Sequence, residues 1–359
     1  MEHRSPLELE IRRRITAAGP MPVAEYMTLC LFDRDHGYYT TRDPFGARGD
    51  FITAPEVSQM FGELIGLWLA QAWHDQKKPK NPRLVELGPG RGTLLRDALR
   101  ALKLMPEFRN ALEVVLVEVS PALSKVQAET LADCGVPLRW SESFDAQSVK
   151  GPIFLIANEF FDALPLRQYV KTERGWCERM VTIGENGALA FALAPDALPA
   201  GLVPDNRDGA PEGGVYERSV AGEAISEQIA HVIARDGGTA LIIDYGYDAP
   251  GFGETLQAVA GHQFADVLAD PGASDLSAHV DFRALAQAAR QGGGSVFGPV
   301  EQGAFLTSIG IVERAEALSR NHLETMTAQL DRLINADQMG TLFKALAILP
   351  KGAPTPAGF

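Results

Sequence analysis

The sequence predicts an α/β protein built on a doubly wound sheet, and two observations support this prediction. From residue 83 onward, short apolar runs alternate with amphipathic segments of about ten to fifteen residues. A glycine-rich turn at residues 88–92 separates the first apolar run from the first of these segments. Strands that alternate with helices imply a mostly parallel sheet with helices on both faces, because each parallel connection must cross over.

The chain before this alternation is predicted to be helical. Residues 6–19 place Ile11 and Ile15 on one helical face, a second helix is expected at 22–32, and a longer one at 57–76. A loop rich in glycine, proline and aspartate separates the last two. The first eighty residues therefore form a helical region ahead of the sheet.

Apolar runs give the expected strands of the sheet in chain order. They cover residues 83–88, 112–119, 137–140, 151–160, 238–246, 295–300 and 342–350. The helices expected between them cover residues 93–105, 121–134 and 221–236. Aromatic residues at helical spacing, such as Phe61 and Trp68, are expected in the core.

The alternation breaks between residues 163 and 218. Residues 167–195 have the pattern of a β-meander, and a polar loop rich in proline and glycine follows. Insertions of this kind commonly carry recognition elements. We therefore divide the chain into an N-terminal helical region that covers the site (1–80), a β-rich substrate-recognition insertion (163–218), and a sheet domain formed by 81–162 and 219–359.

Composition limits the class of protein. The chain has 359 residues with 33 lysines and arginines against 46 aspartates and glutamates, a formal charge of −13. This charge disfavours a nucleic-acid substrate, because it would repel phosphates. The three scattered cysteines predict neither a disulfide framework nor a metal site. Without a signal-like apolar segment or a long apolar run, we expect a soluble, cytoplasmic protein with no membrane insertion.

The glycine motif E-x-G-x-G-x-G predicts a cofactor site. Gly88, Gly90 and Gly92 follow a strand and precede a helix, where backbone N–H groups face a ligand at the end of the sheet. The spacing differs from the G-x-G-x-x-G that binds pyrophosphate. Glu86 in the strand can meet an amino group, and Glu118 at the end of the next strand can accept two ribose hydroxyls. This set favours S-adenosylmethionine over NAD; the alternative is a tight turn with no ligand.

Several sequence blocks together resemble a known family. ELGPGRGTL with VEVSP looks like a class I S-adenosylmethionine-dependent methyltransferase. The blocks that extend the likeness are RDPFGARGDFITAPEVSQMFGELIGLW, NEFFDALP, DYGY, LADPGASDLSAHVDF and GPVEQGAFL. With them the chain resembles the MidA-like family, whose mitochondrial members are complex I assembly methyltransferases that modify an arginine of a core subunit. The resemblance implies a Rossmann-like methyltransferase sheet with an antiparallel final strand, and an arginine of an NADH dehydrogenase subunit as substrate.

The block NEFFDALP is the predicted acceptor site. Glu159 and Asp162 are three residues apart, so one helical turn would place both carboxylates on the same face. A guanidinium stays protonated and is a poor nucleophile, and paired carboxylates can localise its charge and aim one nitrogen. We therefore predict Glu159 and Asp162 as catalytic and Asn158 as a cofactor contact. The alternative is that Asp162 caps a following helix while Asn158 alone contacts the cofactor.

Further candidates come from the flanking blocks. Gly49, Asp50, Thr53, Pro55 and Glu56 could form a wall of the site, as the resemblance implies, or Thr53 and Glu56 could form a capping box. His279 has aspartates nearby that could fix its tautomer for proton relay, although Asp281 is also expected to cap the next helix. Gln302 and Gly303 are implied as lining residues by the resemblance alone.

Other functions remain open from the sequence. One is a non-catalytic assembly chaperone that keeps the cofactor fold. Another is an NAD-dependent oxidoreductase, and a small-molecule methyltransferase is a lesser variant. The sequence does not determine the oligomeric state, and a homodimer stays open.

Overall fold

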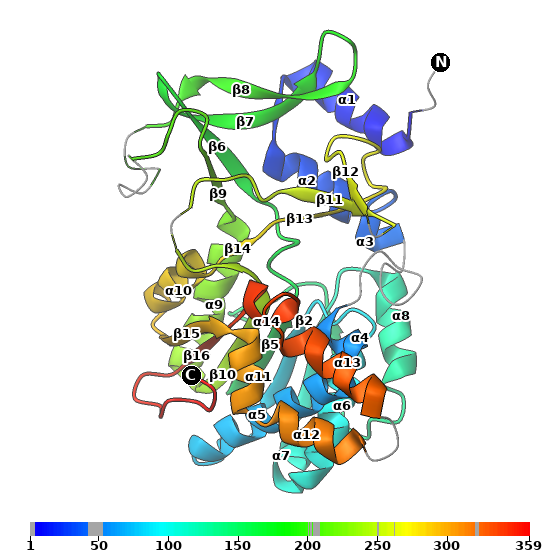
Figure 1. Ribbon diagram of the computed structural model, residues 1–359, viewed down its shortest axis with the longest axis vertical. Coiled ribbons are helices and arrows are strands. Elements are labelled where there is room, and N and C mark those ends of the chain that lie inside the picture. Colours follow the sequence, from blue (N-terminus) through cyan, green and yellow to red (C-terminus); the bar gives the residue numbers. More distant parts are fainter. Residues whose placement is uncertain are drawn as a thin grey trace. The chain divides into compact units, whose positions relative to one another are not determined.

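The chain forms two compact units, each assembled from separate stretches of sequence. The larger unit comprises Phe45–Asp162, Glu223–Tyr247 and Val280–Phe359, and the smaller comprises Met1–Pro44, Ala163–Gly222 and Asp248–His279. The computed structural model, drawn in Figure 1, describes residues 4–41, 53–199, 201, 203, 209–249, 251–261, 263–319 and 323–359.

An eight-stranded sheet forms the centre of the larger unit. Its order is β15-β16-β10-β5-β2-β3-β4, with β14 beside β10. The strands are β2 (Arg83–Leu87), β3 (Glu113–Val117), β4 (Leu138–Ser141), β5 (Ile153–Asn158), β10 (Gly238–Tyr247), β14 (Val280–Asp281), β15 (Ser295–Glu301) and β16 (Phe343–Leu349). Neighbouring strands from β4 to β10 pair in parallel, whereas β16 is antiparallel to both β10 and β15.

This sheet confirms the predicted fold class. It is doubly wound and mostly parallel, and the final strand in the chain is antiparallel. Every residue of β5 is buried, and so are the first seven of β10. A strand covered on both faces must be apolar throughout, which is why these runs could be recognised in the sequence.

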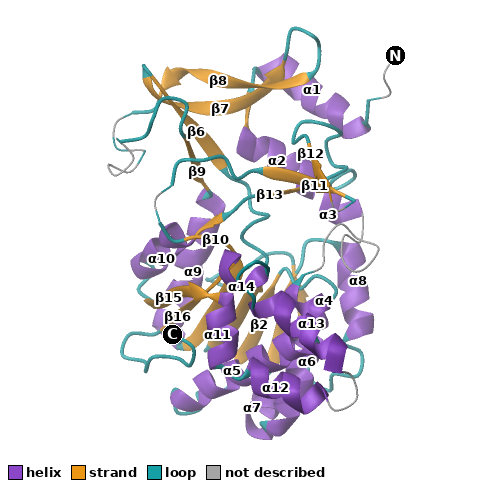
Figure 2. Cartoon of the chain, viewed as in Figure 1, coloured by secondary structure: helices purple, strands orange, loops and turns teal. Residues whose placement is uncertain are grey.

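Helices pack around the sheet, as the purple elements of Figure 2 show. They are α4 (Ala54–Val57), α5 (Gln59–Asp75), α6 (Thr93–Ala101), the short 3₁₀ helix η1 (Leu102–Leu104), α7 (Pro106–Ala111), α8 (Pro121–Thr130), α9 (Val220–Asp236), α10 (Phe282–Gln291), α11 (Gln302–Ser308), α12 (Ile311–Leu318), α13 (Leu323–Ile334) and α14 (Met339–Leu342). Phe61 and Trp68 of α5 belong to the same buried cluster as the strands, as predicted. The helices from α11 to α14, between the last two strands, were not predicted.

The predicted helix at 57–76 is interrupted at its start. Ser58 is extended (φ −157°, ψ 140°), and its hydroxyl accepts a hydrogen bond from the Met60 N–H at 3.3 Å. Serine is a favoured N-cap residue because its side chain satisfies a free N–H of the first turn. Ser58 therefore begins a new helix, α5, and leaves α4 as a separate turn.

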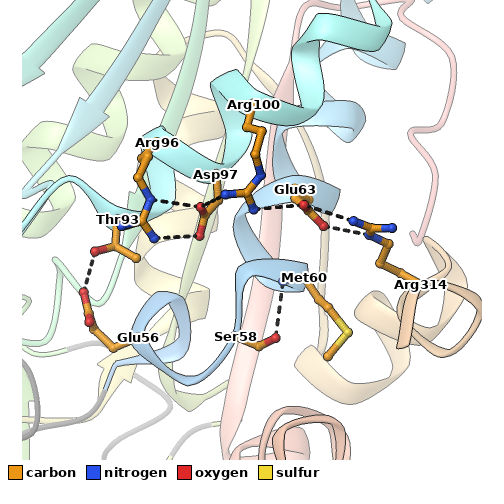
Figure 3. A network of polar contacts seen from close by, with 9 residues as sticks. All are labelled: Glu56, Ser58, Met60, Glu63, Thr93, Arg96, Asp97, Arg100 and Arg314. Atoms are coloured by element: carbon orange, nitrogen blue, oxygen red, sulfur yellow. Dashed lines mark hydrogen bonds and ion pairs between the residues drawn. The ribbon is translucent and has the colours of Figure 1, made fainter. Parts of the chain in front are cut away.

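An ion-pair network centred on the buried Glu63 joins three helices of the larger unit. Figure 3 shows Glu63 of α5 between Arg100 of α6 and Arg314 of α12. The distances are 2.9 Å to Arg100 and 2.7 Å to Arg314, and Arg100 also pairs with buried Asp97 at 2.8 Å. Burial raises the pKa of Glu63, but hydrogen bonds from Arg314 and Arg100 outweigh it and hold that pKa below its ordinary value.

The smaller unit combines helices and two sheets around its own core. Its elements are α1 (Pro6–Ala18), β1 (Met21–Pro22), α2 (Val23–Phe32), α3 (Tyr38–Thr41), β6 (Arg167–Thr172), β7 (Gly175–Ile183), β8 (Leu189–Ala197), β9 (Val215–Arg218), β11 (Gln257–Ala260), β12 (Gln263–Ala265) and β13 (Asp275–Ser277). One sheet has the order β1-β7-β6-β9 with β8 beside β7, and the other is β12-β11-β13. The meander is confirmed; β1, β9 and β11–β13 were not predicted.

The division into units differs from the boundaries expected from sequence. Residues 256–278 contribute Leu256 and Leu276 to the buried cluster that contains Ile11 of α1, so this stretch belongs to the smaller unit. In turn, α4 and α5 belong to the larger unit. Apolar periodicity identifies a buried face but not the core in which it is buried, and this explains both differences.

Candidate active site

A pocket of about 400 Å³, its open mouth included, lies at the carboxyl ends of β2 and β5 in the larger unit. Its lining residues come from α4, the ends of the two strands and the glycine turn: Thr53, Pro55, Glu56, Glu86, Gly88, Pro89, Gly90, Arg91, Thr93, Leu94, Asn158 and Glu159. Ligands of open α/β sheets bind at this edge, outside the carboxyl ends of the strands. Eight of the residues predicted from the sequence therefore line one pocket: Thr53, Pro55, Glu56, Glu86, Gly88, Gly90, Asn158 and Glu159. Gly92, the third glycine of the turn, is not among the lining residues.

The glycine turn requires conformations that other residues rarely adopt. The φ angles are 61° at Gly88, 52° at Gly90 and 79° at Gly92. A Cβ atom on Gly88 would lie 2.9 Å from Cδ2 of Phe160. The positive φ values and this close approach explain why glycine is needed here. Gly92 is the N-cap of α6, so the turn leads directly into that helix.

Two buried polar side chains provide acceptors toward the pocket. Glu86 is 3% and Asn158 is 8% exposed. Glu86 Oε2 and Asn158 Oδ1 have no hydrogen-bond partner among the residues that the structure describes. Burial raises the pKa of Glu86 to about 8. Buried acceptors of this kind are costly unless a ligand donor satisfies them. They fit the ammonium or hydroxyl groups of an amino-acid nucleoside such as S-adenosylmethionine.

Glu118 lies just beyond β3 and is linked to the glycine turn through Gln127. The Glu118 carboxylate accepts hydrogen bonds from the Ser120 N–H at 2.8 Å and from Gln127 Nε2 at 3.0 Å. Gln127 Nε2 also donates to the Gly90 carbonyl at 2.8 Å. Glu118 is not among the residues that line the pocket, so its contact with ribose stays a prediction.

Gln127 was missed by the sequence analysis. It is fully buried on α8, and its Oε1 accepts a hydrogen bond from Trp140 Nε1 at 2.9 Å. Together with Leu123 it forms the buried face of this helix. The available signal was a polar residue at an i, i+4 position of an otherwise apolar face, where a buried amide needs specific partners.

Glu159 follows β5 in an uncommon backbone conformation, with φ 50°. Its Oε1 accepts hydrogen bonds from the Ala54 N–H of α4 at 2.9 Å and from Asn158 Nδ2 at 3.1 Å. Burial raises the pKa of Glu159 to about 7; the nearby Asp162 also raises it, against the two hydrogen bonds. The carboxyl group therefore changes its charge near neutral pH.

The loop after Glu159 is not helical, which corrects the expected helical turn. Residues 159–166 form turns and bends, so Asp162 does not cap a helix there. The backbone N–H groups of Phe160, Phe161 and Asp162 instead donate to Asp244 Oδ2 at 3.1, 2.9 and 3.2 Å. The charge of Asp162 raises the pKa of Glu159, but Asp162 is not among the residues that line the pocket, so its catalytic role stays a prediction.

The short helix α4 forms one wall of the pocket. Glu56 accepts a hydrogen bond from the Thr93 hydroxyl at 2.5 Å, which links α4 to the start of α6 (Figure 3). Thr53 is the N-cap of α4 but its side chain makes no capping hydrogen bond, so the capping box is not formed. Gly49 and Asp50, the other predicted wall residues, lie outside the described residues.

The remaining candidates have other contacts. Gln302 Nε2 donates to the Leu333 carbonyl at 2.9 Å, and a Cβ on Gly303 would lie 2.4 Å from the Ile334 carbonyl oxygen. Both residues thus pack α11 against α13, which does not support a lining role. His279 is the last residue of the smaller unit; its backbone N–H donates to Thr255 Oγ1 at 3.0 Å, and burial lowers the pKa of its imidazole. Its catalytic role stays a prediction.

Asp281 confirms the predicted helix cap. Its carboxylate accepts hydrogen bonds from the N–H groups of Arg283 and Ala284 at 3.0 and 3.1 Å, at the start of α10. Within the described residues, no helix is long and apolar enough to cross a membrane, and no group of three or more His, Cys, Asp or Glu side chains is placed to hold a metal ion.

The sheet order and the pocket define the class of protein. An antiparallel strand inserted beside β10, a glycine turn after β2 and a buried acid within β2 are the arrangement of a Rossmann-like methyltransferase. Residues 64–300 match the family model described as "Putative S-adenosyl-L-methionine-dependent methyltransferase". The chain belongs to this family, and S-adenosylmethionine is its cofactor.

Named relatives extend the similarity over nearly the whole chain. The mitochondrial protein arginine methyltransferase NDUFAF7 of Mus musculus is 38% identical, with 96% of this chain and 85% of the relative covered. The Drosophila melanogaster homologue is 37% identical, with 96% and 85% covered. A crystal structure of a "likely methyl transferase" from Burkholderia thailandensis, bound to S-adenosyl-homocysteine, has a TM-score of 0.86 at 29% identity and covers 98% of this chain and 93% of that chain.

Proposed function

We propose that this enzyme transfers a methyl group from S-adenosylmethionine to an arginine side chain of a protein. The observation that carries the proposal is the Glu159 carboxyl, which lines the pocket next to Asn158 and has Asp162 nearby. An acidic group on the wall of the pocket suits a cationic acceptor. The relatives named as protein arginine methyltransferases support the same acceptor.

The chemistry requires orientation more than activation by covalent intermediates. The cofactor supplies an electrophilic methyl group bound to a sulfonium. In our proposal Glu159 holds one edge of the guanidinium, so that its positive charge is localised there and another nitrogen faces the methyl group. A nitrogen–carbon bond forms as the sulfur–carbon bond breaks, and the surplus proton leaves the methylated guanidinium. Glu159, with a pKa of about 7, is suited to accept it.

As acceptor protein we propose a subunit of the respiratory NADH dehydrogenase, methylated during assembly, in the cytoplasm. This part rests on the family resemblance of the sequence blocks, and the curated relatives are named as mitochondrial proteins. The acidic net charge of −13 suits a cationic segment of the acceptor.

The test compares the respiratory complex from cells with and without this protein by mass spectrometry. We expect one methylarginine to be missing without it and to return with the wild-type gene. Gly90→Val fills the glycine turn and Glu159→Gln removes the acceptor carboxylate, so neither should restore the modification. If the complex assembles normally with both variants although methylation is lost, the methylation is not what assembly needs and a chaperone role is favoured. Calorimetric binding of NADH but not S-adenosylhomocysteine would refute the proposed chemistry altogether.

A further inference from the structure

Asp244, the first residue of the DYGY block, does not line the pocket but makes an unusual set of contacts beside it. It is fully buried on β10. Its Oδ2 accepts hydrogen bonds from three consecutive N–H groups of the loop after β5, those of Phe160, Phe161 and Asp162. Its Oδ1 accepts one from the Tyr245 N–H at 2.9 Å. All four of these hydrogen bonds come from backbone N–H donors.

We propose that Asp244 is the positioning residue of this active site, which fixes the loop 159–162 and, through Phe160, aligns it with the glycine turn. The effect on the arginine acceptor rests on the proposed function, whereas the effect on cofactor binding does not. The loop carries Glu159, and Phe160 meets the cofactor turn at Gly88. The side chain of Asp244, on the neighbouring strand β10, thus positions both the loop that carries Glu159 and the glycine turn of the cofactor site.

The strand register explains how Asp244 reaches the loop. Strands β5 and β10 are parallel, with Ile243 opposite Asn158, and the Glu159 N–H donates to the Ile243 carbonyl at 2.9 Å. Normal sheet pairing therefore ends at Glu159. Asp244 is the next residue of β10. Its carboxylate accepts hydrogen bonds from the next three N–H groups, in place of a backbone carbonyl. Those groups would otherwise lack a strand partner, and buried N–H groups are rarely left unpaired.

The link to the cofactor side is steric. A Cβ atom on Gly88 would lie only 2.9 Å from Cδ2 of the Phe160 ring, so the ring packs directly against the glycine. Gly88 in turn donates its N–H to the Val117 carbonyl of β3 at 3.0 Å. A shift of the loop would therefore move the ring against the first glycine of the turn, because packed interiors transmit displacement.

Only a carboxyl group satisfies this arrangement. An asparagine offers one acceptor oxygen, and its NH₂ group would face either the Tyr245 N–H or the three loop N–H groups, donor against donor. The acidic neighbours of Asp244 are Glu159 and Asp162; burial raises the pKa of Asp244, the two carboxyls add to the rise, and the N–H donors of Asp162 and Tyr245 oppose it. Both oxygens of a carboxyl group can accept hydrogen bonds whether or not it is protonated, whereas the amide of asparagine has one acceptor oxygen.

The decisive variant is Asp244→Asn, with Thr239→Val as its matched control. Thr239 is equally buried on the same strand but near the opposite end, where its hydroxyl donates to the Ile348 carbonyl at 3.2 Å. Hydrogen exchange measures the amides of residues 160–162, and calorimetry measures the affinity for S-adenosylhomocysteine. In Asp244→Asn we expect at least tenfold faster exchange of these amides and about tenfold weaker binding. Thr239→Val should change neither, even where it lowers the unfolding midpoint.

A second variant keeps the inference testable where Asp244→Asn does not fold. Phe160→Leu removes the ring that meets Gly88 but leaves Asp244 and its partners, so binding should weaken while the amides of Phe161 and Asp162 stay protected. Unchanged affinity in both variants, or equal effects in Thr239→Val, would overturn the proposal. With a known acceptor, Asp244→Asn should lower kcat more than it raises KM for the protein. Because exchange and cofactor affinity need no acceptor, failure to find a methylarginine would refute the proposed function and leave this role standing.

Discussion

At the scale of single residues, the site depends on carboxyl groups held in places where ionisation is costly. Glu86 lies within β2 and is 3% exposed, and Glu159 directly follows β5. The pKa of each is raised mainly by burial. Groups with strongly shifted pKa values are common in functional sites, because their charge changes when a ligand arrives.

We predict that Glu86 makes the ligand-free protein less stable as pH rises. The pKa of Glu86 is about 8 in the folded chain against an ordinary 4.5, so the folded state holds its proton more tightly. Stability is therefore lost between about pH 4.5 and 8, by on the order of 5 kcal/mol when both states are ionised. Near pH 4.5, Glu86→Gln should unfold at a urea concentration similar to that of the wild type. Near pH 8.5 it should unfold at a higher urea concentration than the wild type. A constant difference between the two proteins across this range would contradict the raised pKa.

Glu159 gives a second prediction, for the pH dependence of methylation. The carboxylate form is needed to hold a guanidinium, so kcat/KM for the acceptor should rise with pH through about 7, the pKa of Glu159. Rates measured from pH 5.5 to 9 with a labelled cofactor would test this. Glu159→Gln should lose at least about a hundredfold in rate and should lose the rise as well, since its amide does not titrate. A residual rate with the same midpoint would assign that midpoint to another group.

At the scale of elements, the pocket is formed where strand ends, the glycine turn and short helices meet. Each is attached by a side chain: Glu56 to Thr93, Ala54 to Glu159, and Gln127 to both Gly90 and Glu118. A binding site needs such supporting contacts, because loops alone do not fix positions precisely enough. Of these supporting side chains, Gln127 is the one that is not among the residues that line the pocket, so we expect it to affect ligand affinity through the position of the glycine turn.

Gln127→Met tests this for the glycine turn. Methionine fills a similar volume but cannot bond the Gly90 carbonyl or Glu118, so the affinity for S-adenosylhomocysteine should fall about tenfold. Gln76→Met is the matched control, because Gln76 also makes two hydrogen bonds to backbone, with Gly238 at the start of β10. Calorimetric titration of both variants should show weaker binding in the first alone. Equal losses would mean that general destabilisation is responsible.

The ion pairs among the helices allow a prediction about stability. Glu63 is buried and pairs with Arg100 and Arg314, whose side chains are 41% and 36% exposed. Glu63→Gln keeps only one acceptor, so it should lower the free energy of unfolding by roughly 1–2 kcal/mol. Glu107→Gln removes the exposed pair with Lys78 and should cost less than about 0.5 kcal/mol. Denaturant unfolding of both variants measures the two losses. Equal losses would mean that the burial of Glu63 does not strengthen its ion pairs.

At the scale of the whole molecule, the chain contributes to separate hydrophobic clusters in its two units. One core contains the sheet with Phe61 and Trp68, and the other contains Ile11, Leu256 and Leu276. Each unit is assembled from three stretches of sequence. All residues that line the pocket belong to the larger unit. The cofactor should therefore act on the stability of that unit directly.

This gives a prediction for ligand-induced protection. At a hundred times its dissociation constant, S-adenosylhomocysteine should stabilise the unit that binds it by about 2.7 kcal/mol. Hydrogen exchange should therefore slow in β2, β5 and β10, and slow less or not at all in β7 and β11 of the smaller unit. Equal protection of both units would show that they unfold together, as one cooperative body.

Much of the larger unit was predictable from the sequence, because its strands are recognisable as local patterns. Apolar runs such as that of β5 are buried on both faces, and the glycine turn needs positive φ angles that glycine adopts readily. Glu86, Asn158 and Glu159 follow from their place at the ends of these strands. The smaller unit was less predictable, since two-residue and three-residue strands such as β1 and β13 depend on their partners more than on composition.

The sequence by itself determined the sheet, the cofactor turn and the acids beside it, because each depends on residues close together in the chain. Only the tertiary structure decided that α5 packs with the sheet, that residues 256–278 belong with α1, and that Gln127 and Asp244 support the site. Asp244 lies 82 to 84 residues from the amides that it holds. Contacts over such distances arise from strand order, which local periodicity does not encode.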